Sequence, residues 1–110
     1  MTWTIVTKYT RQNNDTDWYI GGSDTNMTTS DVAYVTSNYI DTDKRISAVN
    51  SVSGNGLELT KTFVFRDEAA KNEYVNESRI QSYCSAQASY NSANNITRTG
   101  VSNGETWYNL

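Results

Sequence analysis

The chain of 110 residues has the length of one domain, and its 36% hydrophobic content allows one thin core. The net charge is −3 and no basic run occurs, which argues against duplex nucleic acid as a partner. The lack of histidine excludes His-ligated haem, Ser-His-Asp or Cys-His catalysis and the usual zinc sites. No apolar stretch approaches the ~20 residues of a membrane span, and no signal peptide precedes the first strand. We therefore expect a cytoplasmic protein without a cofactor or a membrane partner.

The first predicted element is a strand over residues 2–10. Trp3, Ile5 and Tyr9 alternate there with Thr4 and Val6, and this period of two is typical of a half-buried strand. A polar loop follows at residues 11–17. The apolar island at residues 18–20 fits either an extension of this strand or a loop that plugs the core.

A helix is predicted from Thr28 to about Asp41. Thr28 and Asp31 have the spacing of a capping box, and Val32, Val35 and Tyr39 form one apolar stripe. Its β-branched and Asn residues give this segment modest helix propensity, so tertiary packing has to hold it.

The clearest unit is a β-hairpin over residues 45–65. Leu57, Leu59, Phe63 and Phe65 share one face of the return strand, and only Lys61 interrupts them. The residues between the strands include Asn55-Gly56, which suits a turn with positive φ.

A second helix is predicted from Glu68 to about Tyr90, with Asp67 as its N-cap. The stripe of this helix contains Cys84, the only cysteine, which we interpret as a small core residue. A last strand over residues 95–101 follows, and residues 105–110 form an unusually aromatic tail.

The order strand, helix, strand, strand, helix, strand predicts an α+β, ferredoxin-like βαββαβ domain that spans residues 1–110. Such a domain has a four-stranded antiparallel sheet with two helices on one face. The opposite face would carry valines and threonines, and Val6, Val49, Val64 and Val101 are predicted there. Because monomers rarely expose such a patch, we expect a homodimer in which two sheets face each other, with the aromatic tail reaching the partner.

Residues 61–74, Lys-Thr-Phe-Val-Phe-Arg-Asp-Glu-Ala-Ala-Lys-Asn-Glu-Tyr, resemble a junction found in the dimeric α+β-barrel superfamily. Antibiotic-biosynthesis-monooxygenase-like members show an aromatic strand, then an acidic or Ser cap, then Glu-Ala at the start of the second helix. The Asn- and Thr-rich, proline-free composition also resembles uncharacterised ferredoxin-like proteins from marine metagenomes. The resemblance implies a barrel made by two chains. Haem-degrading members use an axial His, which this chain lacks, and no complete catalytic set aligns.

The candidate ligand-binding residues are Trp3, Asn50, Tyr74, Glu77 and Arg98. Asn50 and Arg98 on inward strand faces would line a polar cavity, or would reach solvent at strand ends. Trp3 and Tyr74 would form cavity walls, or plain core. Glu77, four residues after Glu73, would do acid–base work or bind a cation, or would flank the apolar stripe in solvent. No residue is assigned a catalytic or metal-binding role.

Two functional classes remain. The first is a homodimeric small-molecule-binding or structural module, and the second is a cofactor-independent monooxygenase or isomerase acting on a small aromatic or polyketide-like molecule. The missing histidine and the lack of a convergent acid–base set favour the first class over an enzyme. A virion or accessory protein is a third interpretation, prompted only by the Asn- and Thr-rich composition.

Overall fold

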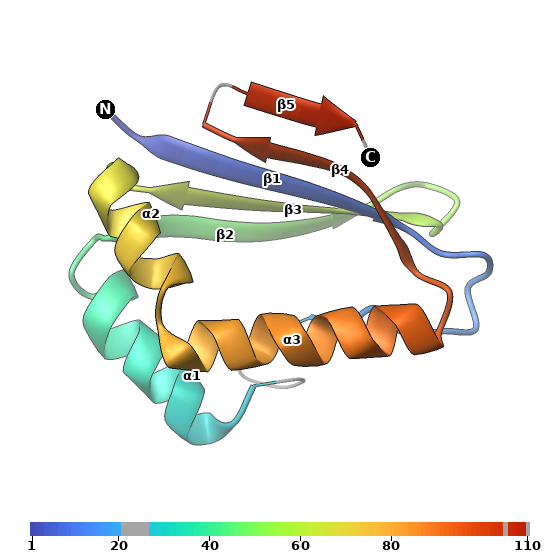
Figure 1. The fold of residues 1–110 in the computed structure, drawn as a ribbon, viewed down its shortest axis with the longest axis horizontal. Coiled ribbons are helices and arrows are strands. Elements are labelled where there is room, and N and C mark those ends of the chain that lie inside the picture. Colours follow the sequence, from blue (N-terminus) through green and yellow to red (C-terminus); the bar gives the residue numbers. More distant parts are fainter. Residues whose placement is uncertain (21–26, 105, 110) are drawn as a thin grey trace.

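The chain folds into one antiparallel sheet with its helices along one side (Figure 1). Residues 1–20, 27–104 and 106–109 are described by the computed structural model, and within them five strands pair in the order β2-β3-β1-β4-β5. The strands are β1 (Trp3–Thr10), β2 (Arg45–Val52), β3 (Glu58–Phe65), β4 (Thr97–Asn103) and β5 (Thr106–Asn109).

All four predicted strands are present, and the order β2-β3-β1-β4 is compatible with a ferredoxin-like fold. The structure adds β5, which the sequence pattern did not predict. In place of a free tail, residues 106–109 pair antiparallel with β4 of the same chain. Residues 105 and 110 of that tail lie outside the described residues, and so do the side chains that we expected to reach a partner.

The hairpin turn between β2 and β3 matches the sequence prediction. Gly56 has a φ of 77°, a conformation that costs little without a Cβ. The Gly56 N–H donates to Ser53 O at 2.9 Å. A Cβ at Gly56 would collide with the Asn14 side chain, because the loop after β1 packs on this turn. Arg11 reinforces the contact by donating from Nε to Gly56 O at 2.8 Å.

The first helical segment comprises α1 (Thr29–Val35) and the π-helical turn η1 (Thr36–Ile40). Thr28 Oγ1 accepts from the Asp31 N–H at 3.1 Å, which confirms the predicted cap. The Asp41 N–H donates to Thr36 O at 2.9 Å, the five-residue step of a π-helix.

The second predicted helix is two helices, α2 (Glu68–Val75) and α3 (Ser78–Ala93). Asp67 caps α2 as predicted, because its Oδ1 accepts from the Ala70 N–H at 2.8 Å. The prediction of one continuous helix is wrong at Asn76 and Glu77, where the Glu77 backbone is extended with a ψ of 131°. Asn disfavours helix interiors, and the break turns α3 to a new direction across the sheet (Figure 1).

The core has two parts. The first, here named the Tyr39 cluster, contains Val35, Tyr39, Phe65, Ala70, Tyr74 and Ile80. The second consists of Tyr9, Leu59 and Ile96, against which Trp18, Ile20 and Tyr90 pack. Residues 18–20 therefore form a loop that plugs this end of the core, the second of the two predicted alternatives.

The open face of the sheet, which the helices do not cover, contains Thr4, Val6, Val49, Thr62 and Val64. The register places Val6 opposite Thr62, and Thr62 opposite Val49. Val101 does not belong to this face as predicted. Its partner in the register is Thr7, and both residues line a cavity on the helix-covered side. An irregularity between Lys8 and Tyr9 shifts the register of β1 against β4 beside Gly100, and a glycine inside a strand often marks such a bulge.

Candidate ligand-binding site

A groove of about 740 Å³ runs between α3 and the sheet, and we name it the α3 groove. Its volume lies within the range of small-molecule pockets. Ile5, Tyr9, Phe63, Ile80 and Val101 provide apolar wall, and polar side chains such as Lys61, Gln87 and Arg98 lie between them. The remaining lining residues are Thr7, Lys61, Phe65, Tyr74, Val75, Tyr83, Cys84, Gln87, Ala88, Asn91, Ser92, Ile96, Thr97, Arg98 and Asn103.

The groove exists because α3 presents small side chains where it passes the sheet. Cys84 and Ala88 lie one helical turn apart on the lining side of α3, and both are exposed. The prediction that Cys84 is a buried core residue is therefore wrong. Cys84 does lie on the side of α3 that faces the sheet, but it borders the α3 groove and its side chain stays exposed. Partial burial within the groove still raises the pKa of the Cys84 thiol.

The groove is electropositive although the chain is acidic. Lys61 and Arg98 are the ionised side chains among the described residues that line it, and no Asp or Glu is among them. Arg98 is exposed at the rim, whereas Lys61 is only 5% exposed. A buried ammonium group without a carboxylate partner is costly, so Lys61 marks the most unusual point of the site.

Lys61 projects from the middle of β3 toward the helices. Its Nζ donates to Tyr19 O at 3.1 Å and contacts the Tyr83 hydroxyl at 3.2 Å. The rings of Tyr9 and Tyr83 lie 5.9 and 5.5 Å from Nζ, within cation–π range. Burial lowers the pKa of Lys61 to about 8, because the surrounding rings replace water around the charge.

The plug at residues 18–20 closes the site beside Lys61. Tyr19 O also accepts from Gln87 Nε2 at 3.2 Å and from the Tyr83 hydroxyl at 3.5 Å. The Tyr19 ring packs on the rings of Tyr83 and Tyr90, with centroids 5.3 Å away in each case. One backbone carbonyl therefore fixes both the amine of Lys61 and the α3 side chains that face it.

A second cavity of about 290 Å³ lies between β2 and the α1–η1 segment. It adjoins the α3 groove through a shared wall, whose members line both cavities. The wall consists of Lys61, Phe63, Tyr74, Ile80 and Tyr83. Lys61 is the one residue of this wall that carries an amine, so a ligand in either cavity meets the same nitrogen.

The structure brings some of the predicted site residues together. Tyr74 lies in the shared wall, where Arg45 Nη1 donates to its hydroxyl at 3.0 Å, and burial raises its pKa. Arg98 lines the α3 groove, and Asn50 lines the second cavity. Trp3 and Glu77 are not among the lining residues of either cavity.

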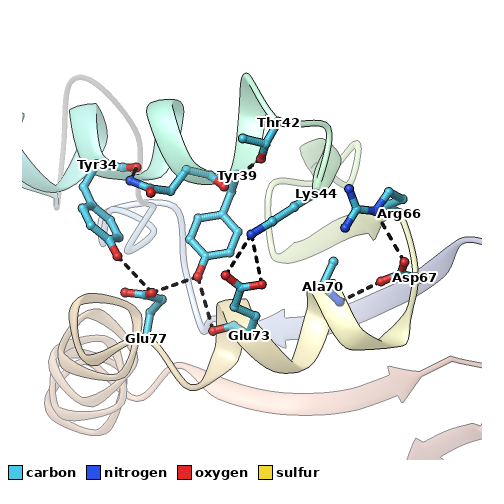
Figure 2. A network of polar contacts seen from close by, with 10 residues as sticks. Tyr34, Tyr39, Thr42, Lys44, Arg66, Asp67, Ala70, Glu73 and Glu77 are labelled. Atoms are coloured by element: carbon cyan, nitrogen blue, oxygen red, sulfur yellow. Dashed lines mark hydrogen bonds and ion pairs between the residues drawn. The ribbon is translucent and has the colours of Figure 1, made fainter.

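Trp3 and Glu77 have structural contacts instead. Trp3 Nε1 donates to Asn103 Oδ1 at 2.7 Å, and Lys71 Nζ lies 5.4 Å from the Trp3 ring. Glu77 Oε1 accepts from the Tyr34 and Tyr39 hydroxyls at 3.0 and 2.9 Å (Figure 2). Burial and the hydrogen bond to Glu77 raise the pKa of Tyr39.

Glu73 and Glu77 do not converge on one site. Glu73 points from α2 toward Lys44, with which it forms an ion pair at 2.9 Å, whereas Glu77 faces the two tyrosines (Figure 2). Among the described residues, no group of three or more His, Cys, Asp or Glu side chains could hold a metal ion.

Sequence reasoning missed Lys61, the residue around which the site is built. A signal was present, because Lys61 lies between Leu59 and Phe63 on the apolar face of a confidently patterned strand. A lysine at an inward strand position either extends its amine to solvent or is desolvated. Here the loop at residues 18–20 covers the amine of Lys61 and desolvates it.

Comparison with protein-family models, with curated proteins and with solved structures finds no match for this chain. Within the described parts of the chain, none of the helices is both long enough and apolar enough to cross a membrane. The fold and the α3 groove therefore carry the functional argument.

Proposed function

We propose that this chain is a small-molecule-binding module and that its ligand occupies the α3 groove. The ligand has a flat apolar body and one carbonyl or carboxylate oxygen. The observation that carries the proposal is the buried amine of Lys61 in a mainly apolar groove of about 740 Å³. An apolar body matches the apolar part of the walls, and a ligand oxygen would give Lys61 Nζ an acceptor beyond Tyr19 O and the Tyr83 hydroxyl.

We further infer that the module works as a homodimer of the α+β-barrel kind, with the open faces of two sheets packed together. The support is the composition of that face, because Val6, Val49 and Val64 lie among threonines, and Val49 is 55% exposed. A two-fold axis would let this patch cover itself. Light scattering should give a mass near twice the 12.4 kDa of one chain, and Val64→Lys should give single chains.

Binding is tested with naphthoate, which combines an aromatic body with a carboxylate. Calorimetry should show one naphthoate per chain at neutral pH. The variant Ala88→Trp fills the groove and should abolish binding. The matched control is Ala86→Trp, an exposed α3 position outside the lining, which should bind like the wild type. Equal binding by both variants would place the ligand elsewhere.

A second candidate function is a cofactor-independent monooxygenase or isomerase acting on a small aromatic or polyketide-like molecule. The contact between the Lys61 amine and the Tyr83 hydroxyl at 3.2 Å favours it, because such a pair can move a proton to or from a bound ligand. Turnover of the bound molecule, measured by mass spectrometry under air and under nitrogen, separates an enzyme from a binding module.

A further inference from the structure

We propose that Lys61 forms a reversible imine with a small apolar aldehyde or ketone that enters the α3 groove. This inference rests on the proposed ligand-binding function and adds a covalent step to it. The geometry consists of a nearly buried primary amine in the wall of two cavities, with a hydroxyl group beside it.

Among the described residues that line the two cavities beside Lys61, none is an anion that would hold the amine as a permanent ammonium ion. No Asp or Glu is among the described residues that line the α3 groove or the second cavity. The titratable and charged groups that line these cavities are Tyr9 on β1, Arg45 on β2, Tyr74 on α2, Tyr83 and Cys84 on α3, and Arg98 on β4. By contrast, Lys44 on the surface is paired with Glu73 at 2.9 Å.

The amine is therefore available as a nucleophile near neutral pH. Burial lowers the pKa of Lys61 to about 8, so a substantial fraction of the amine keeps its lone pair in weakly alkaline solution. Desolvation of this kind is the means by which proteins activate lysine for attack on carbonyl compounds. The carbonyl of Tyr19 accepts one N–H of Lys61 at 3.1 Å and orients the nitrogen.

The chemical step balances with the groups present. The Lys61 nitrogen attacks the carbonyl carbon, and the carbonyl oxygen receives a proton to form a carbinolamine. The carbinolamine nitrogen then loses its one remaining hydrogen as a proton. The hydroxyl group takes up a proton and leaves as water, and a carbon–nitrogen double bond remains. The Tyr83 hydroxyl, 3.2 Å from Nζ, can donate the proton to oxygen and recover it from nitrogen.

The walls select the ligand. Tyr9, Phe63 and Ile80 give the carbonyl compound an apolar environment, and this favours an aromatic body over a sugar-like one. Exclusion of water from the shared wall also protects an imine from hydrolysis.

The test uses naphthaldehyde with cyanoborohydride, which reduces the imine to a stable secondary amine. Peptide mapping should find one naphthylmethyl group on Lys61. Its labelling rate at about pH 8 should exceed that of Lys8, Lys44 and Lys71 at least about tenfold, because burial lowers the pKa of Lys61 to about 8 and the groove concentrates the aldehyde beside it. Naphthoate should protect Lys61 and leave the other lysines and the Met1 amine unaffected. Equal labelling of all four lysines would overturn the inference.

Two variants separate the covalent step from binding. Lys61→Arg keeps the positive charge but has no nucleophilic amine, so it should show no trapping in the groove. Tyr83→Phe lacks the hydroxyl beside Lys61 and should trap naphthaldehyde several-fold more slowly at equal occupancy of the groove. Because both residues line the groove, naphthoate affinity is measured for each variant and used to correct its trapping rate. If wild-type protein binds naphthoate but Lys61 is not trapped, the imine proposal fails and the binding function stands. If naphthoate does not bind and Lys61 is not protected, both fail.

Discussion

Two regions under the same sheet differ in how completely they are packed. In the Tyr39 cluster, Phe65 is fully buried and Tyr39 is 1% exposed, and the Tyr39 hydroxyl bonds to Glu77. Along α3 the same side of the sheet meets Cys84 and Ala88, which leave the α3 groove. Large aromatic side chains with satisfied hydroxyls close the first region, and small side chains keep the second open. Close packing is therefore concentrated at α1 and α2, whereas α3 leaves open space above the sheet.

The two regions should differ most in how much free energy of unfolding is lost when an apolar side chain is shortened to alanine. Phe65→Ala in the Tyr39 cluster should lower the free energy of unfolding by about 3–5 kcal/mol, because it removes a fully buried ring. Val101→Ala in the groove should cost less than about 1 kcal/mol, because its side chain is half-exposed. Urea unfolding measures both. Similar losses would show that the groove side is packed as tightly as the Tyr39 cluster.

A smaller effect is expected from the carboxylate that joins α1, η1 and the α2–α3 junction. Glu77→Gln keeps the shape but removes the charge that two tyrosine hydroxyls share, and should cost about 1–2 kcal/mol. The matched control is Glu73→Gln, whose ion pair with Lys44 is solvent-exposed and should change stability by less than about 0.5 kcal/mol. Equal effects would mean that Glu77 does not organise this junction.

The pH dependence of stability probes the groove region through Lys61. Its pKa is lowered from 10.5 to about 8, so the unfolded chain binds more protons than the folded chain between these values. Stability should therefore rise with pH, by about 1 kcal/mol from pH 7 to 9. Above about pH 10 the raised pKa values of Tyr9 and Tyr74 oppose the trend.

Urea unfolding in a Cys84→Ser background measures the Lys61 effect, because the raised pKa of the Cys84 thiol acts in the opposite direction. Lys61→Met in that background should remove the rise between about pH 7 and 9. A rise that persists in Lys61→Met would assign the effect to another group.

The smallest effect on stability is expected from chemical modification of Cys84, and the rate of this modification tests whether the groove is open. A thiol reagent should modify Cys84 in the folded protein, at one equivalent per chain and without a change in urea unfolding. The reaction should be slower than that of a free thiol at the same pH, because burial raises the pKa of Cys84. Naphthoate should slow it further. Modification only after unfolding would show that α3 closes onto the sheet in solution.

Local signals in the sequence predicted the parts of the fold that depend on neighbouring residues. The structure confirms the helix caps at Thr28 and Asp67, because each cap side chain bonds to a backbone N–H only three residues away. It also confirms the turn at Gly56, because a residue without a Cβ adopts positive φ easily. The four predicted strands are also present, since a period of two survives in any sheet with one buried face.

Tertiary contacts decided the rest. At the break between α2 and α3, Glu77 accepts from the Tyr34 and Tyr39 hydroxyls, which lie far away in the chain. The candidate site was predicted only in part: Tyr74 and Arg98 line the α3 groove, whereas Trp3 and Glu77 hold the fold together.

By itself the sequence determined an α+β chain with a central hairpin, two capped helical segments and no histidine chemistry. Only the tertiary structure decided that Cys84 is exposed, that Val101 faces the helices and that residues 106–109 extend the sheet. It also decided that Lys61 is desolvated. The physical reason is that the period of a strand shows to which face a side chain points, whereas its burial depends on the distant segment that packs against it. For Lys61 that segment is the loop that contains Tyr19, whose carbonyl accepts from Nζ.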